Sequence, residues 1–336
     1  MLKKIHTPNF GLVGFYLVIV IIFSVLSPVF RTPGNINNLL TGFSHIGILA
    51  IGQTFPILLG GIDLSVGAIL GLVGMATFDL MLIFGLPGYV AIPIGLLVGL
   101  LAGLINGLLI VRLKLNPFIV SLATMASFRG LTYAISGRQL FPNLTVLAIQ
   151  DSTYLAIDGT FGFIPRALVY LLILAVVTYF LLHNTKLGMN LYAVGGNENA
   201  ARLAGVNVDR AKIVAYLISG LCAAIAALIL TSRMTTSPEG LGLGFELSAI
   251  AAAVIGGVNL QGGSGSTLGP VLGAFLIGTV YTGMNLLGVT QYAQPVVAGV
   301  ILIGAVGYDQ FVKARRKKDL QEQLLLQSLH QMEKGG

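Results

Sequence analysis

Seven polar or ionisable residues stand inside long apolar stretches of this 336-residue chain, and they are its first candidates for chemistry. They are Asp63, Asp79, Asn106, Arg129, Glu246, Asn259 and Asn285. A charge or an amide is costly against hydrocarbon, so such side chains face a bundle interior or a water-filled cavity. Two interpretations follow: these residues line a path for a polar solute, or they cap broken helices and hold the bundle together.

The predicted lining of a solute path combines carboxylate, amide and hydroxyl side chains. It consists of Gln53, Thr54, Asp79, Asn106, Thr124 and Asn285. Asp79 and Asn106 fall within regular apolar helices, where no helix end needs a cap, so the path interpretation is favoured there. Many hydroxyls and amides with few charges suit a neutral, hydroxylated solute. An ion-coupled carrier stays open, although Asp79 is the only acid well inside a regular span.

Asp63 is better suited to a structural role. It follows Gly60 and Gly61 and precedes the next apolar stretch, where a carboxylate takes up free backbone N–H groups at the positive end of a helix. Glu246 also opens an apolar stretch, so we expect it to act in the same way.

Motifs of catalysis are missing from the sequence. It has no Gly-Lys dipeptide, so it cannot form a Walker phosphate-binding loop. It has one cysteine, four histidines far apart in sequence, and no His-Glu-x-x-His or Gly-x-Ser-x-Gly motif. We therefore predict no catalytic residue, no metal site and no cofactor on this chain, and any ATP must be bound by another polypeptide.

The composition excludes a soluble domain. Hydrophobic residues make up 55% of the chain and charged residues 9%, whereas a soluble domain carries about 25% charged residues. The mean hydropathy is +0.90. The sequence therefore predicts an all-α integral membrane protein, and the net charge of +7 indicates topology rather than nucleic-acid binding.

About ten apolar stretches approach the roughly 20 residues that a helix needs to cross a bilayer. They are 10–28, 38–59, 64–84, 88–110, 117–136, 165–183, 212–232, 246–260, 267–287 and 292–311. The stretch at 246–260 is short, which indicates a tilted, broken or re-entrant segment. Alternating ten spans places most Lys and Arg on one side, so both termini are predicted to be cytoplasmic. We expect one transmembrane domain over 1–312 and a basic, helical, cytoplasmic tail over 313–336.

Two glycine-containing segments that interrupt apolar stretches are similar in sequence; we call them the first and second break. Gly60-Gly61-Ile62-Asp63-Leu64-Ser65 is similar to Gly256-Gly257-Val258-Asn259-Leu260-Gln261, and each copy separates two apolar stretches. Glycine-interrupted helices in repeated positions indicate a transport pathway. Chance similarity of glycine-rich membrane sequence is the alternative.

A polar loop between two apolar stretches contains a candidate coupling helix. Glu198 to Ala204 favour a short helix, Asn197 is a suitable N-cap, and Gly205 is a suitable stop. Such a helix, with Ala200 and Ala201 in its middle, could dock into a groove on a soluble partner. An ordinary structured loop is the alternative.

At this loop the chain resembles a known family. Asn199-Ala200-Ala201-Arg202-Leu203-Ala204-Gly205 is similar to the coupling signature of bacterial ABC importer permeases, with asparagine in place of the first glutamate. That departure is typical of the branch with ribose, xylose and galactose permeases. Other matching stretches are Gly-Gly-Ile-Asp-Leu-Ser-Val-Gly at 60–67, Phe-Arg-Gly at 128–130, Tyr-Ala-Val-Gly-Gly-Asn at 192–197, Phe-Glu-Leu-Ser-Ala-Ile-Ala-Ala at 245–252, Gly-Gly-Ser-Gly with Leu-Gly at 262–269, and Asn-Leu-Leu-Gly-Val at 285–289, which looks most like ribose permeases.

The resemblance implies a permease subunit that imports a monosaccharide or related polyol across the bacterial cytoplasmic membrane. It implies a second permease chain, identical or paralogous, a cytoplasmic ATPase that holds ATP and Mg²⁺, and an extracytoplasmic sugar-binding protein. Membrane lipid is an expected partner and nucleic acid is not. Nucleoside, inositol and autoinducer permeases match the same motifs, so the solute stays open at this point.

Overall fold

The computed structural model describes residues 10–136, 148–290, 293–304 and 307. The first half contains α1 (Phe10–Leu26), the 3₁₀ helix η1 (Pro28–Arg31), α2 (Pro33–Leu58), α3 (Val66–Leu82), α4 (Gly88–Arg112) and α5 (Pro117–Ile135). The second half contains α6 (Ser152–Leu155), β1 (Thr160–Phe161), β2 (Ile164–Pro165), α7 (Arg166–Asn184), α8 (Lys186–Gly196), α9 (Glu198–Leu203), α10 (Val208–Met234), α11 (Phe245–Ile255) and α12 (Leu268–Leu286). One more apolar helix covers Gln294–Gly304.

The prediction of an all-α membrane protein is confirmed. Each of the ten predicted stretches overlaps a helix, and within the described residues β1 and β2 form only a small antiparallel hairpin. Four helices, α4, α5, α7 and α10, combine the length and the hydropathy of a full membrane span. The predicted tail at 313–336 lies outside the described residues.

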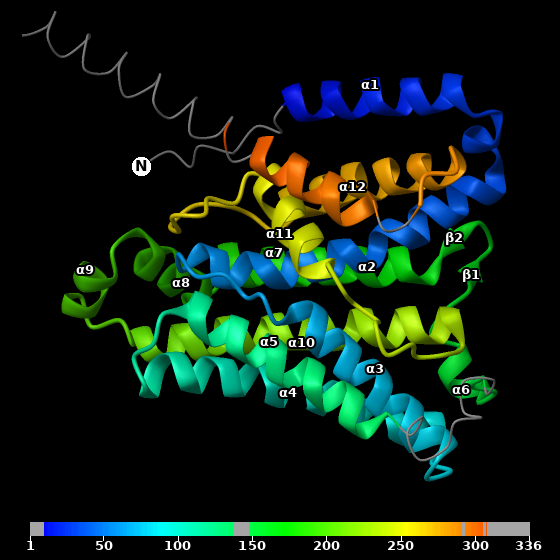
Figure 1. The fold of residues 1–336 in the computed structure, drawn as a ribbon. Coiled ribbons are helices and arrows are strands. Elements are labelled where there is room, and N and C mark those ends of the chain that lie inside the picture. Colours follow the sequence, from blue (N-terminus) through cyan, green and yellow to red (C-terminus); the bar gives the residue numbers. More distant parts are fainter. Residues whose placement is uncertain (1–9, 137–147, 291–292, 305–306, 308–336) are drawn as a thin grey trace, which may run out of the picture.

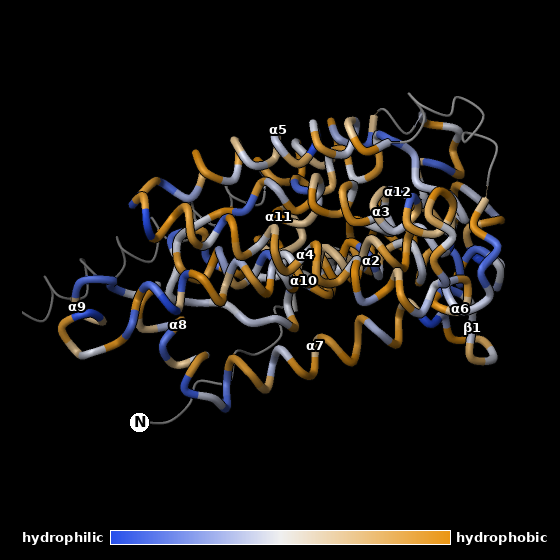
Figure 2. Tube along the Cα trace, turned by 90° about the horizontal axis from the view of Figure 1, so that it is seen from below, coloured by the Kyte–Doolittle hydropathy of each residue, from blue (hydrophilic) through white to orange (hydrophobic). Residues whose placement is uncertain are grey.

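Two helices form the centre of the bundle. In α2 every residue from Ile46 to Leu58 is buried, and α10 is buried along most of its length. Figure 1 shows both running through the middle, with α4 and α5 on one side and α12 on the other. Figure 2 shows hydrophobic residues along the helices and hydrophilic ones towards the two ends of the bundle. We call these the α9 end and the hairpin end, after α9 and the β1–β2 hairpin.

Glycines let α4 lie directly against α10. A Cβ on Gly99 would lie 2.6 Å from the carbonyl oxygen of Gly220, and one on Gly103 would collide with the carbonyl oxygen of Tyr216. Lipid provides little hydrophobic drive for helix association, so close backbone packing of this kind holds membrane helices together.

The helix α11 is too short to span a membrane by itself. α11 has 11 residues, a length of about 16 Å against a hydrocarbon core of about 30 Å. An irregular glycine-rich segment from Ser237 to Gly244 precedes it. The predicted span at 246–260 is therefore a half-helix that ends at Ile255, followed by a turn at Gly256 and Gly257.

Candidate functional site

The polar loop at the α9 end folds as the sequence predicts. The Asn197 side chain accepts a hydrogen bond from the Ala200 N–H at 2.9 Å and so caps α9. At the other end Gly205 takes a left-handed φ of 81°, and the Val206 N–H reaches back to the Ala201 carbonyl at 3.0 Å. This arrangement is a Schellman C-cap, which favours glycine because it needs a positive φ. The predicted capped helix is confirmed, and its coupling role stays a prediction.

Glu198 fastens α9 to the first turn of α10. Its carboxylate accepts a hydrogen bond from Lys212 Nζ at 2.8 Å and lies 3.3 Å from Arg202 Nη2. The hydrogen bond from Lys212 and the nearby positive charges hold the pKa of the Glu198 carboxyl below its usual range. α9 is therefore a fixed projection at the end of the bundle.

The two faces of α9 differ sharply. Ala201 is only 5% exposed and packs towards the bundle, whereas Leu203 is 90% exposed. A leucine this open at the tip of a polar helix is a natural contact for a partner with an apolar groove. The sequence pattern did not single out Leu203, because only the fold shows which side of this short helix faces outward.

Asp63 is the centre of a buried polar cluster at the first break. Its Oδ1 accepts from the Ser65 N–H at 3.0 Å and from the Ser65 hydroxyl at 2.6 Å, and its Oδ2 accepts from the Ser219 hydroxyl of α10 at 2.8 Å. The carboxylate thus ties the loop before α3 to α10. The N-cap of α3 is Ser65, without a side-chain capping bond, so the prediction that Asp63 caps the helix itself is wrong. Gly60 has a left-handed φ of 74°, and a Cβ on Gly61 would lie 2.8 Å from the Tyr216 hydroxyl.

Two of the predicted path residues belong to this same cluster. Asn106 donates from Nδ2 to the Ser65 hydroxyl at 2.8 Å. With its amide oriented to satisfy both groups, Gln53 donates to the Asp63 carbonyl at 3.2 Å and accepts from the Asp63 N–H at 3.0 Å. Both side chains are fully buried. Their contacts brace the break, and their contact with a solute stays a prediction.

The remaining four path candidates lie apart from one another. The hydroxyls of Thr54 and Thr124 are buried and donate to carbonyls of their own helices, Ala50 and Val120. Asp79 is buried in the last turn of α3, and Asn285 lies at the end of α12, where it accepts from Gln294 at 2.9 Å. The structure therefore brings Gln53 and Asn106 together and does not gather all six candidates.

The second break is shaped by close helix approach and by Asn259. A Cβ on Gly256 would collide with the peptide between Gly269 and Pro270 of α12, and Gly257 has a left-handed φ of 90°. Asn259 closes the loop: its Nδ2 donates to the Gly262 carbonyl at 3.1 Å, and its Oδ1 accepts from the Gln261 N–H at 3.2 Å.

The two breaks meet at a glycine junction beside α9. We use the term junction for the Leu58 carbonyl at the end of α2, Gly195 and Gly196 at the end of α8, and Gly262 and Gly263 after the second break. The Gly263 N–H donates to the Leu58 carbonyl at 2.9 Å. A Cβ on Gly195 would collide with the same carbonyl and lie 2.6 Å from Gly263 N. Asn197, the cap of α9, directly follows Gly196.

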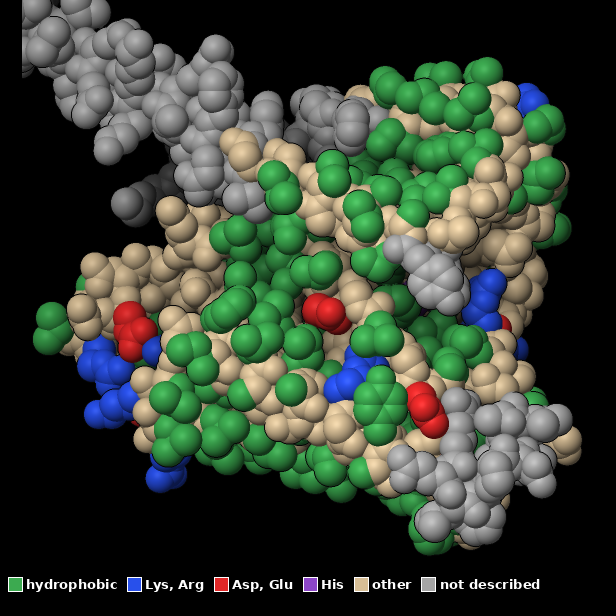
Figure 3. Space-filling view, in the orientation of Figure 1, with side chains coloured by type: hydrophobic (Ala, Val, Ile, Leu, Met, Phe, Trp, Pro, Cys, Tyr) green, Lys and Arg blue, Asp and Glu red, His purple; other side chains and the backbone are tan. Residues whose placement is uncertain are grey.

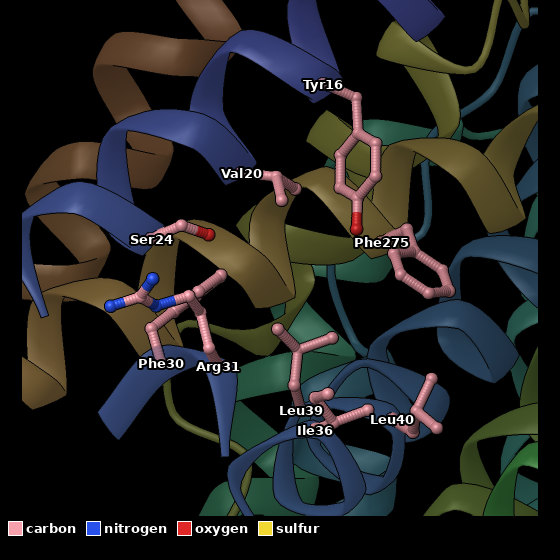
Figure 4. Close-up of a pocket in the computed structure, with 9 residues that line it drawn as sticks. All are labelled: Tyr16, Val20, Ser24, Phe30, Arg31, Ile36, Leu39, Leu40 and Phe275. Carbon is pink, nitrogen blue, oxygen red and sulfur yellow. The ribbon is translucent and has the colours of Figure 1, made fainter. Parts of the chain in front are cut away.

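A cavity of the bundle lies elsewhere. It has a volume of about 310 Å³ and lies between α1, η1, α2 and α12 (Figure 4). Its lining is mainly apolar, with Tyr16, Ser24 and Arg31 as the polar members, and it includes none of the predicted site residues. Within the described residues, no group of three or more His, Cys, Asp or Glu could hold a metal ion.

Comparisons with known proteins identify a family of membrane permeases, in agreement with the helical membrane fold. Residues 35–306 match the family described as "Branched-chain amino acid transport system / permease component". The chain is 43% identical to a ribose import permease protein of Bacillus subtilis (strain 168), over 87% of this chain and 90% of the relative. It is 40% identical to a D-allose transport system permease protein of Escherichia coli (strain K12), over 90% and 92%. An L-arabinose transport system permease protein of the same strain is 38% identical, over 92% of each chain.

No solved structure matches the chain. The family match covers most of the sequence, and it confirms the resemblance that the motifs indicated, including the likeness to ribose permeases. The chain is therefore a transport permease subunit rather than an enzyme, and it belongs to the branched-chain amino acid transport system / permease component family.

Proposed function

We propose that this chain is the membrane-spanning subunit of an ATP-driven importer of the ABC class and carries a monosaccharide. The relatives named above import or transport ribose, D-allose and L-arabinose, and this chain aligns with each over most of its length. All three solutes are neutral aldoses, which agrees with an interior rich in hydroxyls and amides. D-ribose is the first solute to test.

The proposed coupling to ATP hydrolysis is supported by an unbroken series of tight contacts that connects α9 to the two glycine breaks. α9 is capped at both ends, is fixed to α10 through Glu198 and Lys212, and presents Leu203 outward. Its N-cap directly follows the junction. There the Leu58 carbonyl of α2 accepts a hydrogen bond from the Gly263 N–H after the second break. A push on α9 by a closing ATPase would be passed through tight backbone contacts rather than through flexible side chains.

We propose that the α9 end is cytoplasmic. Basic side chains gather there, among them Arg112, Lys186, Arg202, Arg210 and Lys212 at the ends of α4, α8, α9 and α10. Figure 3 shows this concentration of Lys and Arg at the end that carries α9. Positive charge on the cytoplasmic side is the general rule for multi-span proteins. The bacterial cytoplasmic membrane is the proposed location.

Three kinds of protein partner complete the proposed importer. A second permease chain, identical or paralogous, would form the other half of the path. A cytoplasmic ATPase would receive α9 and hold ATP and Mg²⁺, because the sequence of this chain has no phosphate-binding loop. An extracytoplasmic binding protein would deliver the sugar at the hairpin end.

Reconstitution in liposomes tests the proposal. The chain with its ATPase and binding protein should accumulate radiolabelled D-ribose, D-allose or L-arabinose only when ATP is present. The same chain alone, under a proton or sodium gradient, should accumulate none of them. Uptake by the chain alone would instead support the ion-coupled carrier, and ATP-driven uptake of a nucleoside but not of sugars would change the solute class.

A further inference from the structure

Charged side chains interrupt one apolar face of the bundle. Figure 3 shows acidic and basic side chains in the middle of a mainly hydrophobic surface, over the region where α5 and α11 lie in Figure 1. Arg129 lies on α5 and Glu246 opens α11, and both are partly exposed. We call this surface the α5–α11 face. Lipid against such charges would be costly, so the face needs water or polar partners.

Glycines of α3 fix both charged side chains in place. A Cβ on Gly67 would collide with Glu246 Oε2, and one on Gly71, one turn later, would lie 2.9 Å from Arg129 Nη1. Arg129 Nη1 also donates to the Leu241 carbonyl at 2.6 Å, in the irregular segment before α11. The two charges interact through space. The two side chains are therefore held against the backbone of α3.

The pair lies near the middle of the membrane. Glu246 is in the first turn of α11, and the far end of this helix, about 16 Å away, leads into the loop that reaches the junction. A hydrocarbon core is about 30 Å thick, so Glu246 stands roughly halfway across. The N-terminal turns of α3 and α11 both lie beside its carboxylate. Broken helices whose N-termini converge at mid-depth mark binding sites in transporters.

The hydrogen-bonding capacity of the pair is only partly used. Glu246 Oε2 is shielded from solvent and has no hydrogen-bond partner among the described residues. The Arg129 guanidinium has five N–H donors, and the hydrogen bond to the Leu241 carbonyl uses one nitrogen. A sugar hydroxyl donates one hydrogen bond and accepts others, so neighbouring hydroxyls can satisfy a carboxylate and a guanidinium together.

We propose that Arg129 and Glu246 contact the solute directly and form the polar station of the transport path on the α5–α11 face. The site would take a neutral solute with several hydroxyl groups. This proposal rests on the proposed function and adds to it the place and the chemistry of recognition within the membrane.

Cysteine labelling in the assembled importer tests whether the face is wet. Cys222 is buried in α10, so the background from the native thiol is low. Ala126→Cys places a thiol on α5, one turn from Arg129, and Val176→Cys places one at similar depth on the exposed apolar face of α7. We expect a charged, membrane-impermeant thiol reagent to label Ala126→Cys at least about tenfold faster. Equal rates, or no labelling at position 126, would overturn the proposal.

Protection by sugar then tests solute contact. D-ribose, D-allose or L-arabinose should slow labelling of Ala126→Cys in a concentration-dependent way. Adding Glu246→Gln or Arg129→Gln should raise the half-protecting concentration about tenfold or more, because a charged hydrogen bond is lost. Absence of protection by all three sugars, or protection unchanged by both substitutions, would refute the site. ATP-driven uptake by the unmodified importer is measured separately, so failure of the importer function is recognised independently.

Discussion

The junction makes a sharp prediction because two adjacent glycines differ completely in their surroundings. In Gly195→Ala the new methyl would collide with the Leu58 carbonyl oxygen and lie 2.6 Å from Gly263 N. In Gly196→Ala the new methyl meets no atom within 4 Å. Both glycines end the same helix, α8, so each variant adds the same atom at almost the same place.

The expected cost follows from these contacts. Forcing a methyl into packed structure costs about 1–3 kcal/mol. Separating α2 from the second break also stretches the Gly263–Leu58 hydrogen bond of 2.9 Å, and losing a buried bond costs about 1–3 kcal/mol more. Alanine returns up to about 1 kcal/mol through its higher helix propensity. We expect Gly195→Ala to lower stability by about 1–6 kcal/mol, and Gly196→Ala to change it by less than about 1 kcal/mol.

Two measurements check this prediction. Thermal unfolding of the purified complex in detergent should show a lower midpoint for Gly195→Ala than for Gly196→Ala. At a temperature where both variants stay folded, sugar uptake per ATP hydrolysed should fall for Gly195→Ala only, because force from α9 reaches the breaks through this contact. Equal midpoints and equal uptake in the two variants would show that the close contact is unimportant.

Three further predictions concern α9 and the first break. Leu203→Ala should reduce the stimulation of the ATPase by the permease, with little change in unfolding temperature, because the side chain is 90% exposed. Asp63→Ala should lower stability by about 3 kcal/mol or more, because the Ser65 N–H and the Ser219 hydroxyl lose their acceptor. The protection factors of amides in α9 should stay constant as the pH falls from 7 to about 5 and decrease only below the ordinary Glu pKa of about 4.3, since folding lowers the pKa of Glu198 and its contribution is lost on protonation.

Each of these predictions has a matched comparison. Asp209→Ala removes an exposed acid near α9 and should leave stability nearly unchanged, so an equal loss in both aspartate variants would contradict the cluster at Asp63. Lys212→Gln should make the protection of α9 less dependent on pH below about 4.3, because it removes a group that lowers the Glu198 pKa. If Leu203→Ala lowered unfolding temperature and ATPase stimulation together, the side chain would be serving the fold rather than a partner.

Local rules were enough to predict several features. The caps at Asn197 and Gly205 depend on residues close in sequence, so propensity alone located α9. Each of the ten predicted apolar stretches overlaps a helix, and four of the helices in the described residues are long and apolar enough to span a membrane. Asp63 was expected to cap α3, but its carboxylate orders the loop just before this helix, and Ser65 is the N-cap.

The rest depends on contacts between distant segments. Sequence patterns grouped Gln53 and Asn106 with Asp79 as path residues, whereas the fold places the first two around Asp63. The contact of Gly195 with Leu58 joins residues more than a hundred positions apart, and no local pattern encodes it. The sequence identified Arg129 and Glu246 as charges that are costly in a membrane. Only the fold shows that both side chains pack against adjacent turns of α3, at Gly71 and Gly67.

The half-helix α11 also has a consequence for how the protein is made. Its 11 residues fall well short of the length that the membrane-insertion machinery releases into lipid as an independent span. Gly256 and Gly273 bring its backbone directly against α12, which has 19 residues. We expect α11 to enter the bilayer together with α12, as a hairpin, after α12 has been synthesised. A glycosylation-site tag between α11 and α12 would then change its reported side only in chains long enough to include α12, so the second break would be completed late in biosynthesis.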